Sequence, residues 1–357
     1  MRMRAAAPGM ARAGGRGMGR GWGWLWLAPA VLVAALFFGT AVGETRIPLA
    51  TVIEVLAVKA GLSSAALDPI DASVIWHYRL SRAVVAACGG ASLALSGLIL
   101  QALLRNPLAE PYLLGISAGA STGAVLIAVA GVGGGLVGMS AGAFAGALTA
   151  FALVAGLAHA AGGGSGLRGA GVIILAGIAG SQMFNALTAL IIAQSASAEQ
   201  ARGIMFWLLG NLSGVRWPDT GLALPVAALG LAVTLWHARA LDAFTFGAEA
   251  AAALGIDLRR TQAVLIGTAA LVTAVMVSIA GAIGFVGLVV PHAMRFLVGT
   301  RHARLVPATA LAGAVFLVLS DVVSRIVIPG QVLPIGVITA LVGAPAFAVV
   351  MVRGRQR

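Results

Sequence analysis

The sequence predicts an all-α polytopic membrane protein with about ten transmembrane helices. Of its 357 residues, 60% are hydrophobic and only 10% are charged. Soluble domains usually have about 45–50% apolar and about 25% charged residues. So few charged side chains cannot cover a water-facing surface, which excludes a soluble enzyme, a disordered regulator and a secreted disulfide scaffold. The net charge of +12 does not indicate a nucleic-acid partner, because most basic residues flank apolar stretches.

Ten apolar stretches approach the about 20 residues that a spanning helix needs. The expected spans are 24–43, 82–104, 113–131, 138–160, 171–193, 219–237, 263–280, 284–298, 305–324 and 333–352. The eighth is short, and only residues 281–284 separate it from the seventh. Arg and Lys are concentrated in the tails and loops on the side of the N-terminus, which places both termini in the cytoplasm.

The expected organisation is a basic cytoplasmic tail at 1–23, a transmembrane domain at 24–352 and a cytoplasmic C-terminus at 353–357. A basic tail before an apolar run also describes a signal peptide, and Ala41-Val42-Gly43 is an acceptable cleavage site. The run from Trp24 to Val42 is longer than a usual signal core, which favours an uncleaved span. Segment 44–81 is expected outside, segment 238–262 inside, and a short helix is expected outside within 194–207.

The sequence contains no motif of a catalytic site. It has no phosphate-binding loop G-x-x-x-x-G-K-[ST], no H-E-x-x-H, no C-x-x-C and no G-x-S-x-G. The five histidines are scattered, so no metal site is expected. Acidic residues lie in loops or at span ends except Asp321, which can pair with Arg325 at i, i+4. Since ion-coupled transporters carry ionisable groups in mid-membrane, the energy for transport is expected to come from elsewhere.

Four stretches of sequence are distinctive. They are Arg79-Leu-Ser-Arg82 with the small-residue run to Gly97, the segment 101–120 containing Asn106-Pro-Leu-Ala-Glu-Pro111, the segment Phe246 to Ile256, and Gly284-Phe-Val-Gly-Leu-Val-Val-Pro-His292 with Leu333-Pro-Ile-Gly336 and Gly343-Ala-Pro345. In this order, over about residues 45–355, they closely resemble the permease subunits of ABC importers for ferric siderophores, haem and cobalamin, the FecCD family.

The resemblance implies that the chain works in a complex of several subunits. Two copies of the chain form the path as a homodimer, two cytoplasmic ATPase subunits hold ATP and Mg, and a periplasmic binding protein delivers the substrate. The chain itself is then a multi-pass protein of the bacterial inner membrane that binds no cofactor and has no enzymatic activity. An iron chelate is the expected substrate. Haem is favoured because the fifth span is apolar and carries Met and Phe residues. Ferric siderophores and cobalamin are the alternatives. An ion-coupled secondary transporter and a receptor without transport are the rival functions.

The resemblance also implies four groups of functional residues. The arginines that meet the binding protein at the outer face are Arg79, Arg82 and Arg325. The cytoplasmic gate consists of Asn106, Leu108 and Ser165. The segment 241–260 couples to the ATPase through Gly247, Glu249, Ala251, Leu254, Gly255 and Arg259. The fifth span lines the path with Ser181, Gln182, Met183, Phe184, Asn185 and Thr188.

Residue chemistry agrees with these roles but leaves plainer alternatives open. Guanidinium groups stay charged and bind carboxylates in a forked geometry, which suits docking to an acidic partner. Arginines at span ends also extend toward lipid headgroups, which is the plainer alternative. Two prolines within five residues break a helix, so segment 106–111 is a gate or a simple turn. The fifth span has the most polar interior, and its methionine and phenylalanine give adaptable walls or ordinary core packing.

Overall fold

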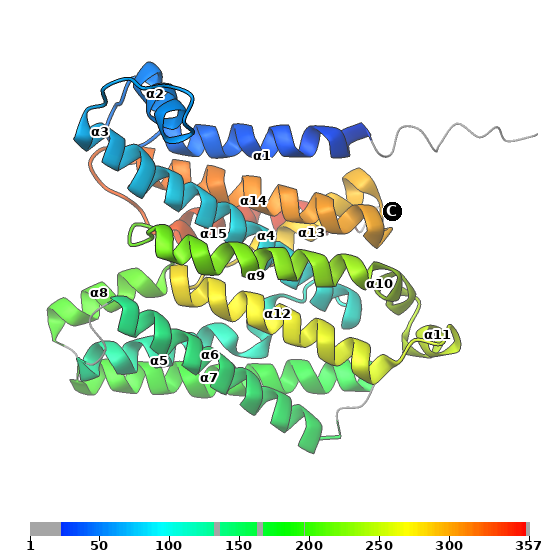
Figure 1. Ribbon diagram of the computed structural model, residues 1–357. Coiled ribbons are helices and arrows are strands. Elements are labelled where there is room, and N and C mark those ends of the chain that lie inside the picture. Colours follow the sequence, from blue (N-terminus) through cyan, green and yellow to red (C-terminus); the bar gives the residue numbers. More distant parts are fainter. Residues whose placement is uncertain (1–22, 132–135, 163–166, 196, 355–357) are drawn as a thin grey trace, which may run out of the picture.

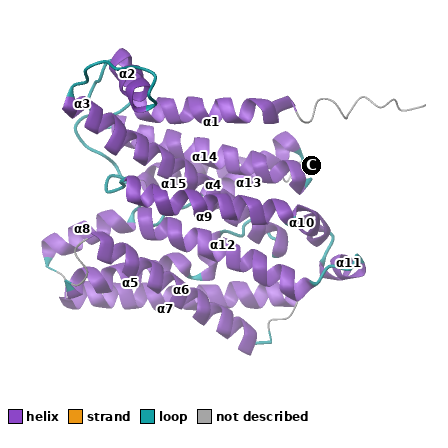
Figure 2. Cartoon of the chain, in the orientation of Figure 1, coloured by secondary structure: helices purple, strands orange, loops and turns teal. Residues whose placement is uncertain are grey.

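The computed structural model describes residues 23–131, 136–162, 167–195 and 197–354. Within these ranges the chain is a bundle of helices without a β-strand (Figure 2). The long helices run side by side along one direction (Figure 1). The predicted tail 1–23 lies outside the described residues except for Gly23, which opens the first helix.

Each of the ten expected spans corresponds to a helix. They are α1 (Gly23–Ala41), α4 (Ser81–Leu103), α5 (Ile116–Ala130), α6 (Leu136–Ala160), α7 (Leu167–Ser195), α9 (Trp217–Trp236), α12 (Leu258–Ala280), α13 (Val286–Val298), α14 (His302–Ile326) and α15 (Ile335–Gly354). Six helical segments in the described residues are long and apolar enough to cross a membrane, and four shorter apolar helices accompany them. A polytopic membrane protein is therefore confirmed, while the crossing of all ten helices stays a prediction.

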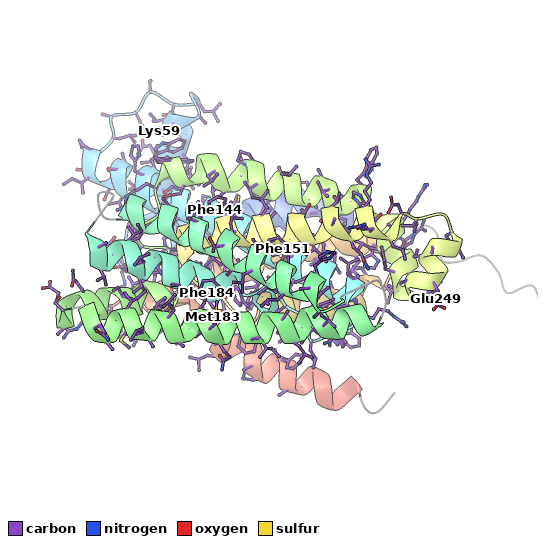
Figure 3. The ribbon with its side chains drawn as sticks, turned by 90° about the horizontal axis from the view of Figure 1, so that it is seen from below. Lys59, Phe144, Phe151, Met183, Phe184 and Glu249 are labelled. Carbon is purple, nitrogen blue, oxygen red and sulfur yellow. The ribbon has the colours of Figure 1, made fainter. Side chains whose placement is uncertain are left out.

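Short helices mark the two ends of the bundle. At one end, here called the α2 end, lie α2 (Leu49–Lys59), α3 (Pro69–Ser73), the π-helix η1 (Val74–Leu80) and α8 (Ala198–Leu208). At the other, the α11 end, lie α10 (Ala238–Thr245) and α11 (Ala248–Ala253), near the start of α1 (Figure 1). Lys59 and Glu249 label these opposite ends (Figure 3). The segments expected outside and inside thus lie at opposite ends.

Helix α4 forms the centre of the bundle and is buried along nearly its whole length. Small residues allow neighbouring backbones to approach it closely. A methyl group added at Gly90 would overlap the carbonyl oxygen of Gly313 on α14, and one at Gly97 would overlap that of Gly287 on α13. At these two positions glycine is required by the close approach of the neighbouring backbone.

Local chemistry fixes several helix starts. Asp68 caps α3 by accepting a hydrogen bond from the backbone N of Ile70 at 2.8 Å. Ser197 and Gln200 form a reciprocal capping box at α8, and Asp257 accepts from the backbone N of Arg260 at the start of α12. Such caps satisfy amide groups that the first turn leaves unpaired. They keep the short helices ordered where the chain leaves the bundle.

Candidate docking, translocation and coupling sites

The three arginines expected to form an outer charged patch lie together at the α2 end, but they are buried. Their exposed fractions are 2% for Arg79, 1% for Arg82 and 2% for Arg325. The expectation of an exposed docking patch is therefore wrong for these side chains. The physical reason is that each guanidinium group finds acceptors inside the chain.

Arg82 and Arg325 share one buried carboxylate. Nε of Arg82 lies 2.7 Å from Oδ1 of Asp321, and Nη2 of Arg325 lies 3.0 Å from Oδ2. The predicted pairing of Asp321 with Arg325 is thus confirmed, and Arg82 is a second partner. Arg82 also donates to the hydroxyls of Tyr78 at 2.9 Å and Ser213 at 3.1 Å. These contacts join α4 and α14 near their ends.

Arg79 and Arg325 cap the C-terminal end of α1. Nη1 of Arg79 donates to the carbonyl of Ala41 at 3.0 Å, and Arg325 donates to those of Gly39 and Val42 at 2.8 Å each. The last carbonyls of a helix lack partners and carry partial negative charge. A side chain at Gly43 would collide with the Arg79 guanidinium. The arginines therefore attach α1 to the bundle.

Helix α7, the expected path helix, lies at the edge of the bundle (Figure 1). Gln182, Met183 and Asn185 are exposed on it, and Ser181 is half-buried. Phe184 and Thr188 point inward instead, where Thr188 shares a 2.7 Å hydrogen bond with Thr122 of α5. Residues at i, i+4 share one helix face, and the face with Phe184 and Thr188 packs against α5. The assignment of these two residues to the path surface is therefore corrected. Figure 3 shows the adjacent residues Met183 and Phe184 on α7.

The expected gate segment is an irregular turn between α4 and α5. Oδ1 of Asn106 accepts a hydrogen bond from the backbone N of Leu108 at 2.9 Å, and Leu108 is exposed. Burial raises the pKa of the neighbouring Glu110 carboxyl above its ordinary value. Ser165 lies outside the described residues. Leu108 thus presents an apolar side chain at this turn, and the role of the segment as a gate stays a prediction.

Tyr112 connects this turn to a second break in the helices. It lies in η2 (Pro111–Leu114), and its hydroxyl donates to the carbonyl of Ile283 and accepts from the amide of the same residue, each at 2.7 Å. Residues 281–285 separate α12 from α13, as the sequence predicted. Gly177 of α7 lies so close to Leu113 that a side chain there would overlap its carbonyl oxygen. No sequence pattern indicated the role of Tyr112, because its partner Ile283 is 171 residues away.

The expected coupling segment forms α10 and α11 at the α11 end. Gly247 and Gly255 have φ values of 112° and 80°, which favour glycine. Glu249 and Arg259 are exposed, and Leu254 is 71% exposed. Ala251 is fully buried, so its assignment to the contact surface is corrected.

Phe246 was not expected on this surface. It is 79% exposed and precedes α11, whereas Leu254 follows it. Two large apolar side chains are thus presented by a segment too polar to span a membrane. Exposed apolar groups of this kind mark contact sites. The sequence feature that could have indicated Phe246 as a contact residue is its position as an aromatic residue directly before Gly247.

The FecCD transport family matches residues 31–353. The chain belongs to this family. FecCD proteins are permease subunits of ABC transporters, and such subunits are not themselves catalytic.

Two curated relatives of this FecCD chain carry names that describe import. The cobalamin import system permease BtuC of Halobacterium salinarum is 41% identical over 275 residues, 77% of this chain and 72% of that protein. The Fe(3+) dicitrate permease FecD of Escherichia coli is 35% identical, over 79% of this chain and 86% of the relative.

A solved structure shares the fold of this FecCD chain. It is described as a metal-chelate type ABC transporter in an inward-facing conformation. The TM-score is 0.79 at 30% identity, and the match covers 92% of this chain and 99% of the other. The irregular segments described above therefore belong to an ABC permease fold.

Proposed function

We propose that this chain is the membrane-spanning subunit of a binding-protein-dependent importer for a metal chelate. Two copies form the path, and two ATPase subunits with ATP and Mg drive it. A periplasmic binding protein delivers the substrate across the bacterial inner membrane. Membership in the FecCD transport family over residues 31–353 is the observation that carries this proposal.

The exposed surface of α7 supports a path between two copies. Gln182, Met183 and Asn185 lie on its open face, next to the exposed apolar residues Leu187 and Leu190. A polarizable thioether and amide groups give a wall that contacts a chelate without holding its metal tightly. In this arrangement the path is lined where α7 of one copy faces α7 of the other.

The exposed pair Phe246 and Leu254 supports ATPase coupling at the α11 end. Both side chains flank α11, and Gly247 and Gly255 bound this short helix. A compact projection with apolar contacts fits a cleft on a partner subunit. Glu249 and Arg259 lie at its exposed rim and set orientation rather than affinity.

Docking of the binding protein requires a different outer surface from the one first expected. Arg79, Arg82 and Arg325 stabilise the α2 end from within, so they act on docking only through the shape of that end. The exposed face there consists of α2, α3 and the loop between them. This surface is the docking face in the proposal.

Haem stays the first substrate to test, on the basis of Met183 on the open face of α7. The 41% identity to a permease named for cobalamin import makes cobalamin a second candidate. Both are large metal chelates, so one path shape serves either. Ferric siderophores are the third candidate, because the relative FecD is named for Fe(3+) dicitrate transport.

The proposal is tested by affinity purification of the tagged full chain from its native membranes. An ATP-hydrolysing subunit and a second copy of the chain are expected to co-purify. Uptake into reconstituted vesicles is then measured for haem, cobalamin and a ferric siderophore. Isolation of the chain without any ATPase, with uptake driven by an ion gradient, would instead support the secondary transporter.

A further inference from the structure

A basic pocket lies at the α11 end between α4, α10, α13 and α14. Its volume is about 530 Å³. The charged or titratable residues in its wall are Arg105, His292, Arg295 and His302, and Thr245 and Thr300 add hydroxyl groups. None of the described residues that line it is acidic. Arg105 and Arg295 therefore bring two positive charges to the pocket, and the carboxylate that contacts its wall, Asp242, pairs with His302 and with neither arginine.

The guanidinium of Arg295 is positioned by a neutral partner. Its Nη1 donates to Oε1 of Gln101 at 2.6 Å, while Nε2 of Gln101 donates to the carbonyl of Gly287 at 3.0 Å. No ion pair to Arg295 or Arg105 forms within the described ranges. The charge of Arg295 is thus held at a fixed place and is available to an anion.

Two imidazole nitrogens in the wall also lack partners among the described residues. They are Nδ1 of His292 and Nε2 of His302. His302 is 2% exposed, and its Nδ1 lies 2.7 Å from Oδ1 of Asp242 on α10. Buried polar atoms are normally satisfied. These two nitrogens leave hydrogen-bonding capacity open on residues that line the pocket.

Arg105 occupies a conformation that favours glycine. It follows the last turn of α4 with φ of 49°, one of two non-glycine residues with positive φ among those described. A left-handed residue of this kind often ends a helix, and the backbone N of Asn106 donates to the carbonyl of Gln101 at 3.2 Å across it. This helix end directs Arg105 to the pocket, whose wall its side chain lines.

We propose that this pocket binds the phosphate group of an anionic phospholipid from the adjoining leaflet. Basic pockets between membrane helices on the cytoplasmic side bind such headgroups. The acyl part has an apolar surface to follow, because Phe296 and Leu297 of α13 are exposed and the Phe296 ring contacts that of His292 at 5.2 Å. A free phosphate would use only the charged half of this surface.

The inference depends on the membrane location of the chain and on no particular transport substrate. The bound lipid bridges Arg105, after α4, and Arg295, on α13, beside Thr245 and Phe246 of the coupling segment. It is thus a structural ligand at the base of the ATPase-facing surface. Transport substrate and lipid occupy separate places, so a negative result for one leaves the other intact.

The test measures lipid adducts on the purified full chain by native mass spectrometry. Phosphatidylglycerol is titrated against phosphatidylcholine, with inorganic phosphate as a third arm. Arg295→Gln and Arg105→Gly are each expected to weaken phosphatidylglycerol binding about fivefold. Arg105→Gly removes the unfavourable backbone conformation, so it should fold well. Arg260→Gln, which removes an exposed arginine outside the pocket, is the matched control and should change nothing.

Three results would overturn the proposal. One is phosphatidylglycerol binding that is equal in wild type and both pocket variants. Another is binding of inorganic phosphate that displaces the lipid at equal concentration, which would assign the pocket to a free anion. The third is loss of ATPase affinity in the pocket variants with unchanged lipid binding, which would assign it to an acidic side chain of the partner.

Discussion

At the residue scale, the negative charge of the Asp321 carboxylate balances positive charge of the buried arginines at the α2 end. Two guanidinium groups contact it, and two guanidinium groups cap α1. The three guanidinium groups and the carboxylate are all buried, so each charged group depends on the others for the solvation that water would provide. The arginine positions were visible in the sequence. Their burial was not, since an arginine at a span end fits an exposed or an enclosed place equally well.

Asp321→Asn is expected to destabilise the protein by about 3–5 kcal/mol, because it leaves two buried guanidinium groups without a counter-charge. Unfolding in detergent by added dodecyl sulfate measures the change. Glu54→Gln on α2, where the side chain is exposed, is the control and should unfold as wild type does. Equal stability of Asp321→Asn and wild type would mean that the network contributes nothing.

Leu254→Asp is expected to abolish ATP-driven uptake while leaving membrane insertion normal, because a charge enters an apolar contact with the ATPase. Leu254→Met keeps an apolar side chain of similar volume and should retain most activity. Uptake and ATP hydrolysis are measured together in reconstituted vesicles. Normal coupling in Leu254→Asp would remove this residue from the interface.

At the element scale, apolar length predicted the helices well, because a membrane requires about 20 such residues. The break between α12 and α13 was expected at residues 281–284 and lies at 281–285, although apolar length alone hardly separates the two helices. The inward direction of Phe184 and Thr188 could not be predicted, because apolar and polar residues occur on both faces of α7. The link from Tyr112 to Ile283 and the burial of Ala251 depend on residues far away in the sequence.

Packing of α5 against α6 gives a sharp test of the glycine contacts. Gly119 and Gly123 face Gly142 and Gly146, and a side chain at any of these positions would meet the opposite backbone. Gly146→Leu should therefore cost about 1–3 kcal/mol of folding free energy. Gly156→Leu on the same helix meets open space and should be tolerated. Equal thermal stability of the two variants in detergent would contradict the close approach.

At the scale of the whole molecule, the bundle has two different ends. Short helices with a buried charge network mark the α2 end, and an exposed apolar projection beside a basic pocket marks the α11 end. Helix α7 leaves one side open between them. In the proposed function these three surfaces meet the binding protein, the ATPase and a second copy, in that order.

Single cysteines on α7 test the pairing of two copies. In a Cys88→Ala background, Met183→Cys or Asn185→Cys is expected to cross-link between copies with a short bifunctional reagent, because both positions are exposed. Thr188→Cys is the matched control and should remain unlinked, since that side chain packs inside the bundle. Cross-linking at position 188 but at neither exposed position would place the interface elsewhere.

The most direct test of the account is uptake of the metal chelate into proteoliposomes that contain this chain, its ATPase and its binding protein. Uptake should require ATP and Mg on the ATPase side and should continue when ionophores collapse all ion gradients. Leu254→Asp should lose it under the same conditions. Uptake that needs no ATPase and stops with the ion gradient would contradict the assignment of this chain as an ABC importer permease.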